Sequence, residues 1–106
     1  MTKTEFYALL VRKTPRIYEG LVTEQDIVIS IQASKMHFCD PREDGHATYT
    51  HYEVWSEEPL YGLEDYQHLK GSPRQLYSYV PVEELIKELE CHGKIQTFKQ
   101  ALKNTH

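Results

Sequence analysis

One stretch of this sequence, Leu76 to Gly93, constrains the fold more than any other, because it combines a short β segment with a complete set of helix signals. Pro81 suits the first turn of a helix, and the acidic residues after it lie where the helix dipole favours negative charge. The apolar positions that share one face at helical spacing are Val82, Leu85, Ile86 and Leu89. Gly93 can adopt the left-handed conformation that ends a helix, and Glu83 and Lys87 have the spacing of a favourable ion pair. The stretch therefore predicts a strand that runs directly into an amphipathic helix over residues 81–91.

Two earlier segments favour β-strands. Over residues 26–34, apolar side chains at the odd positions alternate with polar ones, which is the two-residue period of a strand with one buried face. Residues 47–56 are rich in Thr, Tyr, Val and Trp, but neither face is cleanly apolar, so the buried side stays open. Turn dipeptides at Asp40-Pro41 and Asp44-Gly45 predict a structured loop over residues 35–46. We expect the two strands to pair antiparallel.

The remaining segments allow more than one interpretation. Thr2 and Glu5 have the spacing of a capping box, which predicts a helix, whereas the apolar run from Phe6 to Val11 is short enough for a buried strand. Of the two we favour the strand. Residues 57–75 predict a long connection with one or two helical turns between Gly62 and Gly71, and residues 95–104 predict a second short helix.

Together these elements predict one α+β domain over residues 1–106. It comprises an antiparallel sheet of three or four strands packed against the helix at 81–91 and the second short helix at 95–104. A chain of 106 residues buries roughly two thirds of its unfolded surface, enough for a core. Two cysteines, Cys39 and Cys91, do not make a disulfide framework, and no secretory signal or membrane span is visible. We therefore expect a cytoplasmic protein with no membrane partner and no cofactor.

Charge is distributed unevenly along the chain. Residues 40–65 hold eight acidic residues and one base, a net charge of −7, whereas the rest of the chain holds eight acidic residues and eleven bases, a net charge of +3. This segment argues against a phosphate-binding surface, which needs clustered Lys and Arg, so we expect no direct binding of nucleic acid. It is compatible either with a loop-rich region kept soluble by its carboxylates or with a surface that attracts a basic partner.

Aromatic residues coincide with the acidic segment. Tyr and Trp are enriched where protein interfaces are strong, and carboxylates around them steer a Lys- and Arg-rich partner. The candidate contact residues are Glu43, Asp44, Tyr49, Tyr52, Glu53, Trp55, Glu57, Glu58, Tyr61, Glu64, Asp65 and Tyr66. Tyrosines in strands are often core residues, and we expect half of these rings to be buried.

Residues that carry chemistry are present without a specific motif. His37, Cys39, His46 and His51 are ligand types that zinc accepts, but their spacing matches no standard metal site. Cysteine and histidine pairs satisfy the residue types of nucleophilic catalysis and nothing more. We therefore expect a protein that is not an enzyme, and keep as an alternative a small metal-dependent hydrolase or nuclease that uses these four residues.

Three runs carry a resemblance. Residues 30–43, residues 49–54 and the Tyr-Val-Pro-Val-Glu run at 79–83, followed by His92-Gly93, resemble small phage- or prophage-encoded proteins of uncharacterised function. The resemblance spans residues 27–93 and implies a bacterial or phage cytosolic setting. It brings no catalytic residues with it.

These observations lead to one functional hypothesis. The chain is expected to be a non-enzymatic accessory protein of a phage or mobile element that binds and inhibits or modulates a host protein with a basic surface. One concrete form is an inhibitor of a nucleic-acid-handling defence complex, such as an anti-CRISPR protein. A structural or assembly protein of a phage particle, paired through an exposed strand edge, is a further alternative.

Overall fold

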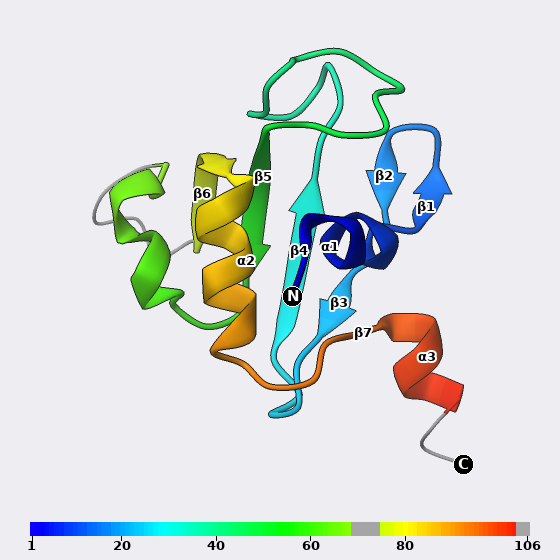
Figure 1. Ribbon diagram of the computed structural model, residues 1–106, viewed down its shortest axis with the longest axis vertical. Coiled ribbons are helices and arrows are strands. Elements are labelled where there is room, and N and C mark those ends of the chain that lie inside the picture. The colour runs from blue at the N-terminus through cyan, green and yellow to red at the C-terminus, as the bar shows by residue number, and fades with distance from the viewer. Residues whose placement is uncertain (69–74, 104–106) are drawn as a thin grey trace.

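The computed structural model describes residues 1–68 and 75–103 (Figure 1). Its elements are α1 (Lys3–Leu9), β1 (Arg12–Thr14), β2 (Ile17–Tyr18), β3 (Leu21–Val22), β4 (Val28–Gln32), β5 (His51–Ser56), the 3-10 helix η1 (Tyr61–Tyr66), β6 (Leu76–Pro81), α2 (Val82–Glu90), β7 (Gln96–Thr97) and α3 (Phe98–Lys103). The predicted α+β class and antiparallel pairing are confirmed. The sheet has five strands in the order β6-β5-β4-β3-β7, and β1 and β2 form a separate hairpin. It exceeds the predicted three or four strands because β3 and β7 contain two residues each, too few to show a period.

Alternation along the two central strands decides which side of the sheet is buried. In β4, Ile29 and Ile31 are buried while Ser30 and the other even positions are half-buried, as the sequence predicts. In β5, Tyr52 and Val54 are buried, which settles the side that the sequence left open. Figure 1 shows α1 and α2 on one side of the sheet, and we call this side the inner face. The other side, which we call the outer face, carries Ser30, Gln32, Glu53, Trp55, Leu76 and Ser78.

The strand–helix stretch folds as predicted, with two local differences. All four stripe residues of α2 are buried, and Gly93 has a φ of +73° after the helix. Pro81 is the N-cap rather than a residue of the first turn. The predicted pairing of Glu83 with Lys87 is wrong, because Glu83 instead lies 3.0 Å from the Lys3 ammonium and Lys87 lies 3.6 Å from Glu84. The helix therefore uses one of its acidic residues to contact α1.

The N-terminal segment is a helix, so the favoured strand is wrong. The capping box forms in full, since Thr2 Oγ1 accepts the Glu5 N–H at 3.1 Å and Glu5 Oε1 accepts the Thr2 N–H at 2.9 Å. Phe6 is fully buried, and its ring meets Tyr52 edge-on with 5.5 Å between centroids. Helix capping and one buried ring thus outweigh the short apolar run.

The C-terminal helix is shorter than predicted. Gln96 and Thr97 pair with β3 as strand β7, and α3 begins only at Phe98. On its apolar face, Phe98 lies against Gly20 of the β2–β3 connection, and both Phe98 and Leu102 are partly exposed. The predicted last residue, Asn104, lies outside the described residues, as do residues 69–74 of the long connection. Within that connection the predicted helical turn is η1, although η1 begins one residue before Gly62.

The side chain of Gln32 in β4 makes two hydrogen bonds to the backbone of Tyr18 in β2. Gln32 donates from Nε2 to the Tyr18 carbonyl at 3.0 Å and accepts the Tyr18 N–H on Oε1 at 2.9 Å. Both bonds are those that a neighbouring strand would supply.

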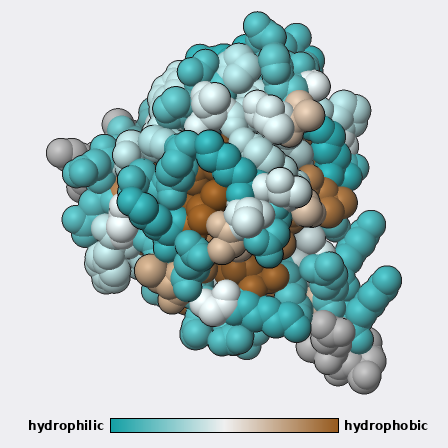
Figure 2. Space-filling model, in the orientation of Figure 1, coloured by the Kyte–Doolittle hydropathy of each residue, from teal (hydrophilic) through white to brown (hydrophobic). Residues whose placement is uncertain are grey.

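On the side seen in Figure 2, apolar atoms gather near the centre, around the region of α1 and α2, with hydrophilic atoms around them.

Candidate functional site

The predicted acidic segment is divided by β5 into two parts. Asp40, Glu43 and Asp44 lie in the loop before the strand, and Glu57 and the acidic residues of η1 follow its other end. The two groups of carboxylates therefore lie at opposite ends of one strand.

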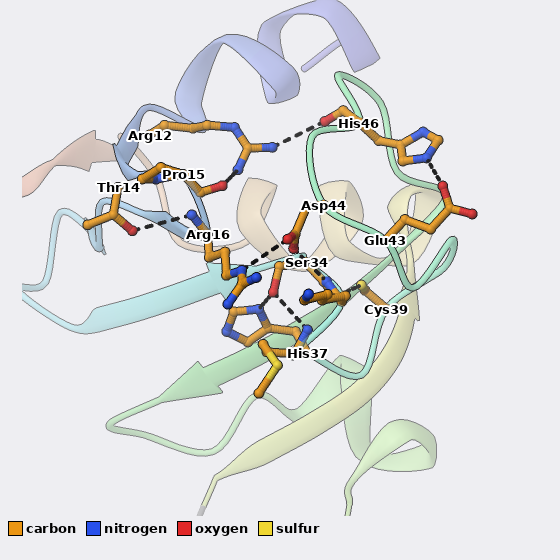
Figure 3. A network of polar contacts seen from close by, with 12 residues as sticks. Arg12, Thr14, Pro15, Arg16, Ser34, His37, Cys39, Glu43, Asp44 and His46 are labelled. Atoms are coloured by element: carbon orange, nitrogen blue, oxygen red, sulfur yellow. Dashed lines mark hydrogen bonds and ion pairs between the residues drawn. The ribbon is translucent and has the colours of Figure 1, made fainter.

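One carboxylate of the loop part, Asp44, pairs with the β1–β2 hairpin (Figure 3). Arg16 Nε donates to Asp44 Oδ2 at 3.0 Å, and Asp44 Oδ1 accepts the Lys35 N–H at 3.0 Å. The Lys35 N–H and then the Arg16 guanidinium hold the pKa of Asp44 below its ordinary value. Glu43 Oε2 lies 2.7 Å from His46 Nε2. The loop carboxylates are thus committed to contacts within the molecule.

Arg12 fastens the hairpin to the same loop (Figure 3). Its Nη1 donates to the Pro15 carbonyl at 2.9 Å and its Nη2 donates to the His46 carbonyl at 3.3 Å. The guanidinium also lies 4.6 Å from the centre of the Tyr18 ring. The bond from Arg12 to the His46 carbonyl and the Arg16–Asp44 pair therefore hold hairpin and loop together, and Arg12 also stacks on Tyr18 within the hairpin.

The second part of the acidic segment makes no ion pair with Lys or Arg within residues 1–68 and 75–103. Residues 56–68 include four carboxylates and no Lys or Arg. The four, all exposed, are Glu57, Glu58, Glu64 and Asp65. Glu57 bonds the end of β4, because its Oε1 accepts the Val28 N–H at 2.8 Å. These four are the exposed carboxylates of the predicted contact set on this side of β5.

Two of the predicted contact tyrosines are core residues, which is a correction. Tyr49 and Tyr52 are 0% exposed, and their rings meet edge-on with 5.7 Å between centroids. The Tyr49 hydroxyl donates to the Glu43 carbonyl at 2.6 Å, so it closes the β4–β5 loop from inside. Tyr66 is half-buried against the core, whereas Tyr61 is 76% exposed.

The outer face brings Trp55 to the surface. This side chain is 42% exposed, and strand register places it between Ser30 of β4 and Leu76 of β6. Glu53 precedes it by two residues on the same face, and Glu57 follows it by two residues directly after the strand. An exposed indole between carboxylates therefore occupies the middle strand of three.

A second cluster continues the outer face toward the β4–β5 loop. Phe38 donates its backbone N–H to Glu53 Oε2 at 3.3 Å, and its ring stacks on His68 with 4.6 Å between centroids. His68 Nδ1 lies 2.8 Å from Ser78 Oγ on β6. The Arg42 guanidinium lies 5.3 Å from the centre of the Phe38 ring. These contacts tie two separate loops to the outer edge of the sheet.

Tyr79 marks a backbone irregularity beside this cluster. Its φ is +52°, which is rare for an aromatic residue, and the pairing of β5 with β6 shifts register at this point. The Tyr79 N–H donates to the Phe38 carbonyl at 3.0 Å, and the two rings are 6.1 Å apart. The irregularity turns the ring of Tyr79 outward, where it is exposed.

The alternative metal site does not assemble. In residues 1–68 and 75–103, no group of three or more His, Cys, Asp or Glu side chains is placed to hold a metal ion. Each of the four candidate ligands has its own partner: His37 contacts Ser34, Cys39 donates to the Ser34 carbonyl, His46 contacts Glu43 and His51 contacts Thr50. Separate local contacts thus account for all four.

Two pairs of side chains, Ser34 with His37 and Glu88 with His92, are of residue types found in catalytic sites. Ser34 Oγ lies 2.7 Å from His37 Nδ1, but Ser34 is fully buried and also accepts the Met36 N–H, as in a serine turn (Figure 3). Burial raises the pKa of the neighbouring Cys39 thiol, which disfavours the thiolate. Neither the Ser34 hydroxyl nor the Cys39 thiol is therefore presented to solvent.

The other pair lies in a cleft of 460 Å³ between η1 and α2. Glu88 accepts the Gly62 N–H at 2.8 Å and lies 2.8 Å from His92 Nε2, and Tyr61 and Cys91 line the same cleft. Glu88 is buried and serves both contacts, so its first role is to attach η1 to α2.

Comparison of the chain with models of protein families, with curated proteins and with solved structures finds no match. Across the parts of the chain that the structure describes, no helix has the length and apolar character needed to cross a membrane.

Three residues of the outer-face surface, Phe38, Arg42 and His68, were not among the predicted contact residues. Phe38, Arg42 and His68 belong to loops, where no period marks a buried or exposed side, and only tertiary contacts bring them together. Trp55 and Glu53 were found because the strand itself carries them.

Proposed function

We propose that this chain is a non-enzymatic accessory protein of a phage or mobile element, which binds a host protein through the outer face of its sheet. The observation that supports this proposal best is the exposed aromatic surface on the side of the sheet away from α1 and α2. Its members are the exposed Arg42, Trp55, His68 and Tyr79 together with the half-buried Phe38. Tryptophan, tyrosine and arginine are the residue types that dominate the energetics of protein interfaces.

Charge supports a basic partner. Glu53 and Glu57 lie on either side of Trp55, and the carboxylates of residues 57–65, which pair with no Lys or Arg in the described part of the chain, continue at the edge formed by η1. A Lys- and Arg-rich surface would be steered to this edge and would dock on the rings. Inhibition of a nucleic-acid-handling defence complex, as by an anti-CRISPR protein, is the form of this function in which such carboxylates occupy phosphate-binding residues.

Capture from a bacterial lysate with two matched variants tests the proposal. Trp55→Ala and Tyr61→Ala each remove one exposed aromatic side chain, from the outer face and from the cleft beside α2 respectively. We expect Trp55→Ala to lose the captured protein and Tyr61→Ala to retain it, with both variants folded by circular dichroism. Equal capture by wild type and Trp55→Ala would contradict the proposal.

A further inference from the structure

We propose that Trp55, Glu53 and Glu57 form a receptor for one arginine side chain, presented by an extended segment of the protein partner. This inference rests on the proposed function, because it assumes a basic protein partner. It adds the chemical group that the surface recognises.

Two of the aromatic rings on the outer face, those of Phe38 and Trp55, differ in whether a cation already lies over them. The ring of Phe38 is already covered on the molecule itself, by the Arg42 guanidinium at 5.3 Å and by the stacked His68 ring. The ring of Trp55 is 42% exposed, and the described residues place no Lys or Arg over it. Tryptophan is the strongest cation–π acceptor among the side chains, so the bare ring is the better of the two positions.

Carboxylates are in place to pair with a guanidinium on that ring. Glu53 lies two residues before Trp55, about 7 Å along the strand, and its Oε2 accepts the Phe38 N–H. Glu57 lies two residues after Trp55 and uses Oε1 to accept the Val28 N–H. Each carboxylate is thus oriented by one backbone bond, and within residues 1–68 and 75–103 its second oxygen has no bonded partner.

The neighbours of Trp55 on the two adjacent strands have smaller side chains. Register places Ser30 on one side of Trp55 and Leu76 on the other, and both are shorter than an indole. A planar guanidinium can stack on the indole and donate to a carboxylate at its edge, which the compact ammonium of lysine does less well. The geometry therefore favours arginine over lysine.

Trp55 is the one tryptophan of the chain, so its fluorescence reports on this site alone. The probes are blocked triarginine and trilysine peptides, titrated into the intact protein at about 0.1 M salt, where charges more than about 10 Å away are screened. We expect a saturable change in fluorescence with the arginine peptide and a Kd at least about twofold weaker with the lysine peptide. Amide chemical shifts should change at Glu53, Trp55 and Leu76.

Matched variants separate the site from general electrostatics. Glu53→Gln and Glu57→Gln should each weaken the arginine peptide by about twofold to fivefold, the usual size of an exposed charge pair. Glu84→Gln makes the same change of charge on α2, across the sheet, and should leave Kd unchanged. Trp55→Phe, followed by chemical shifts, should bind more weakly but still prefer arginine.

Equal weakening by Glu84→Gln, no preference for arginine, or shift changes centred on Glu64 and Asp65 would each overturn the inference. The proposed function fails separately, in the lysate capture. A partner that is lost with Trp55→Ala while the peptide titration shows no arginine preference would refute the arginine receptor and leave the docking surface in place.

Discussion

Tyr52 is buried at the centre of the inner face, with its ring against Phe6 and Tyr49. Burial raises the pKa of its hydroxyl well above the ordinary value, and burial also raises the pKa values of Tyr18 and Tyr77. The neutral forms are favoured by folding, so above about pH 10 the folded protein binds more protons than the unfolded chain. The free energy of unfolding therefore falls as pH rises above about 10, by up to about 1.4 kcal/mol per pH unit for each such group.

Replacing Tyr52 by Phe should change both the stability and its pH dependence. The Tyr52 hydroxyl accepts the buried Tyr49 N–H at 3.3 Å, so Tyr52→Phe should cost about 1–3 kcal/mol at pH 7. Above pH 10 the variant should lose stability less steeply than wild type, because one of the titrating groups is gone. Urea unfolding at pH 8 and at pH 11 measures both effects. Tyr61→Phe, at an exposed position, should match wild type at both values. Parallel pH dependence of wild type and Tyr52→Phe would contradict this account.

Single residues also show where sequence reasoning ends. Trp55 could be placed on one face of a strand from its neighbours, but that this face is the exposed one follows from Tyr52 and Val54 packing inward. Nothing in the residue type separates the buried Tyr49 from the exposed Tyr61. Tyr49 is buried because of its contacts with Tyr7 of α1 and with Glu43 of the β4–β5 loop, and these contacts between distant segments are set by the tertiary structure.

At the scale of elements, η1 is attached to α2 chiefly by one carboxylate. Glu88 accepts the Gly62 N–H and contacts His92, and Tyr77 supports the same region because its hydroxyl accepts the Leu60 N–H at 2.8 Å. A Cβ on Gly62 would lie 2.8 Å from Glu88 Oε1, so the close approach depends on glycine at this position. Attachment of η1 therefore depends on a small set of buried polar contacts.

Glu88→Ala should loosen η1. The change leaves the Gly62 N–H without its acceptor, so we expect a loss of about 1–3 kcal/mol in the free energy of unfolding. Amide hydrogen exchange should rise first at residues 62–66, before the strands are affected. Glu88→Gln keeps an oxygen for the Gly62 N–H and should cost less, and Glu84→Gln on the exposed side of α2 should cost little. Slow exchange at Gly62 in Glu88→Ala would contradict the assignment.

The join between β2 and β4 gives a second test at this scale. Gln32→Leu is close in volume but removes both bonds to the Tyr18 backbone, so we expect a loss of about 1–3 kcal/mol in the free energy of unfolding. Gln25→Leu, the same change at an exposed position between β3 and β4, is the control and should change stability by less than half as much. Thermal unfolding of the two variants decides between a structural role for the Gln32 amide and simple solvation of a half-buried side chain.

Elements were predictable in proportion to their length and periodicity. β4 and α2 carry several alternating or helical positions each, and both form where the sequence places them. The two-residue strands β3 and β7 offer no period, and β7 exists because β3 pairs with residues that the helical pattern assigned to α3. α1 shows the reverse case, in which a capping box of two residues outweighs a short apolar run.

At the scale of the whole molecule, the fold redistributes the charge of the sequence. The basic hairpin contacts the acidic β4–β5 loop, where Arg16 balances Asp44, while residues 56–68 contain four carboxylates and no Lys or Arg. Position along the chain shows where acidic residues are concentrated, but their neutralisation depends on contacts between segments far apart in the sequence. Arg16 and Asp44, which pair across the hairpin and the loop, are 28 residues apart.

Two double charge reversals, equal in net charge, separate these parts. Glu58→Lys with Asp65→Lys changes the acidic part, whereas Glu43→Lys with Asp44→Lys changes the balanced part. The first pair should leave stability within about 0.5 kcal/mol, because these side chains are exposed, and should abolish capture of a basic partner at low salt. The second pair breaks the contact of Asp44 with Arg16 and replaces it by like charges, so it should lower stability by about 1 kcal/mol while reducing capture less. Capture across a salt series and urea unfolding measure the two outcomes. Both variants carry the same net charge, so a stronger loss of capture in the second would show that the partner binds the loop before β5. That result would contradict the proposal that the partner binds the carboxylates after β5.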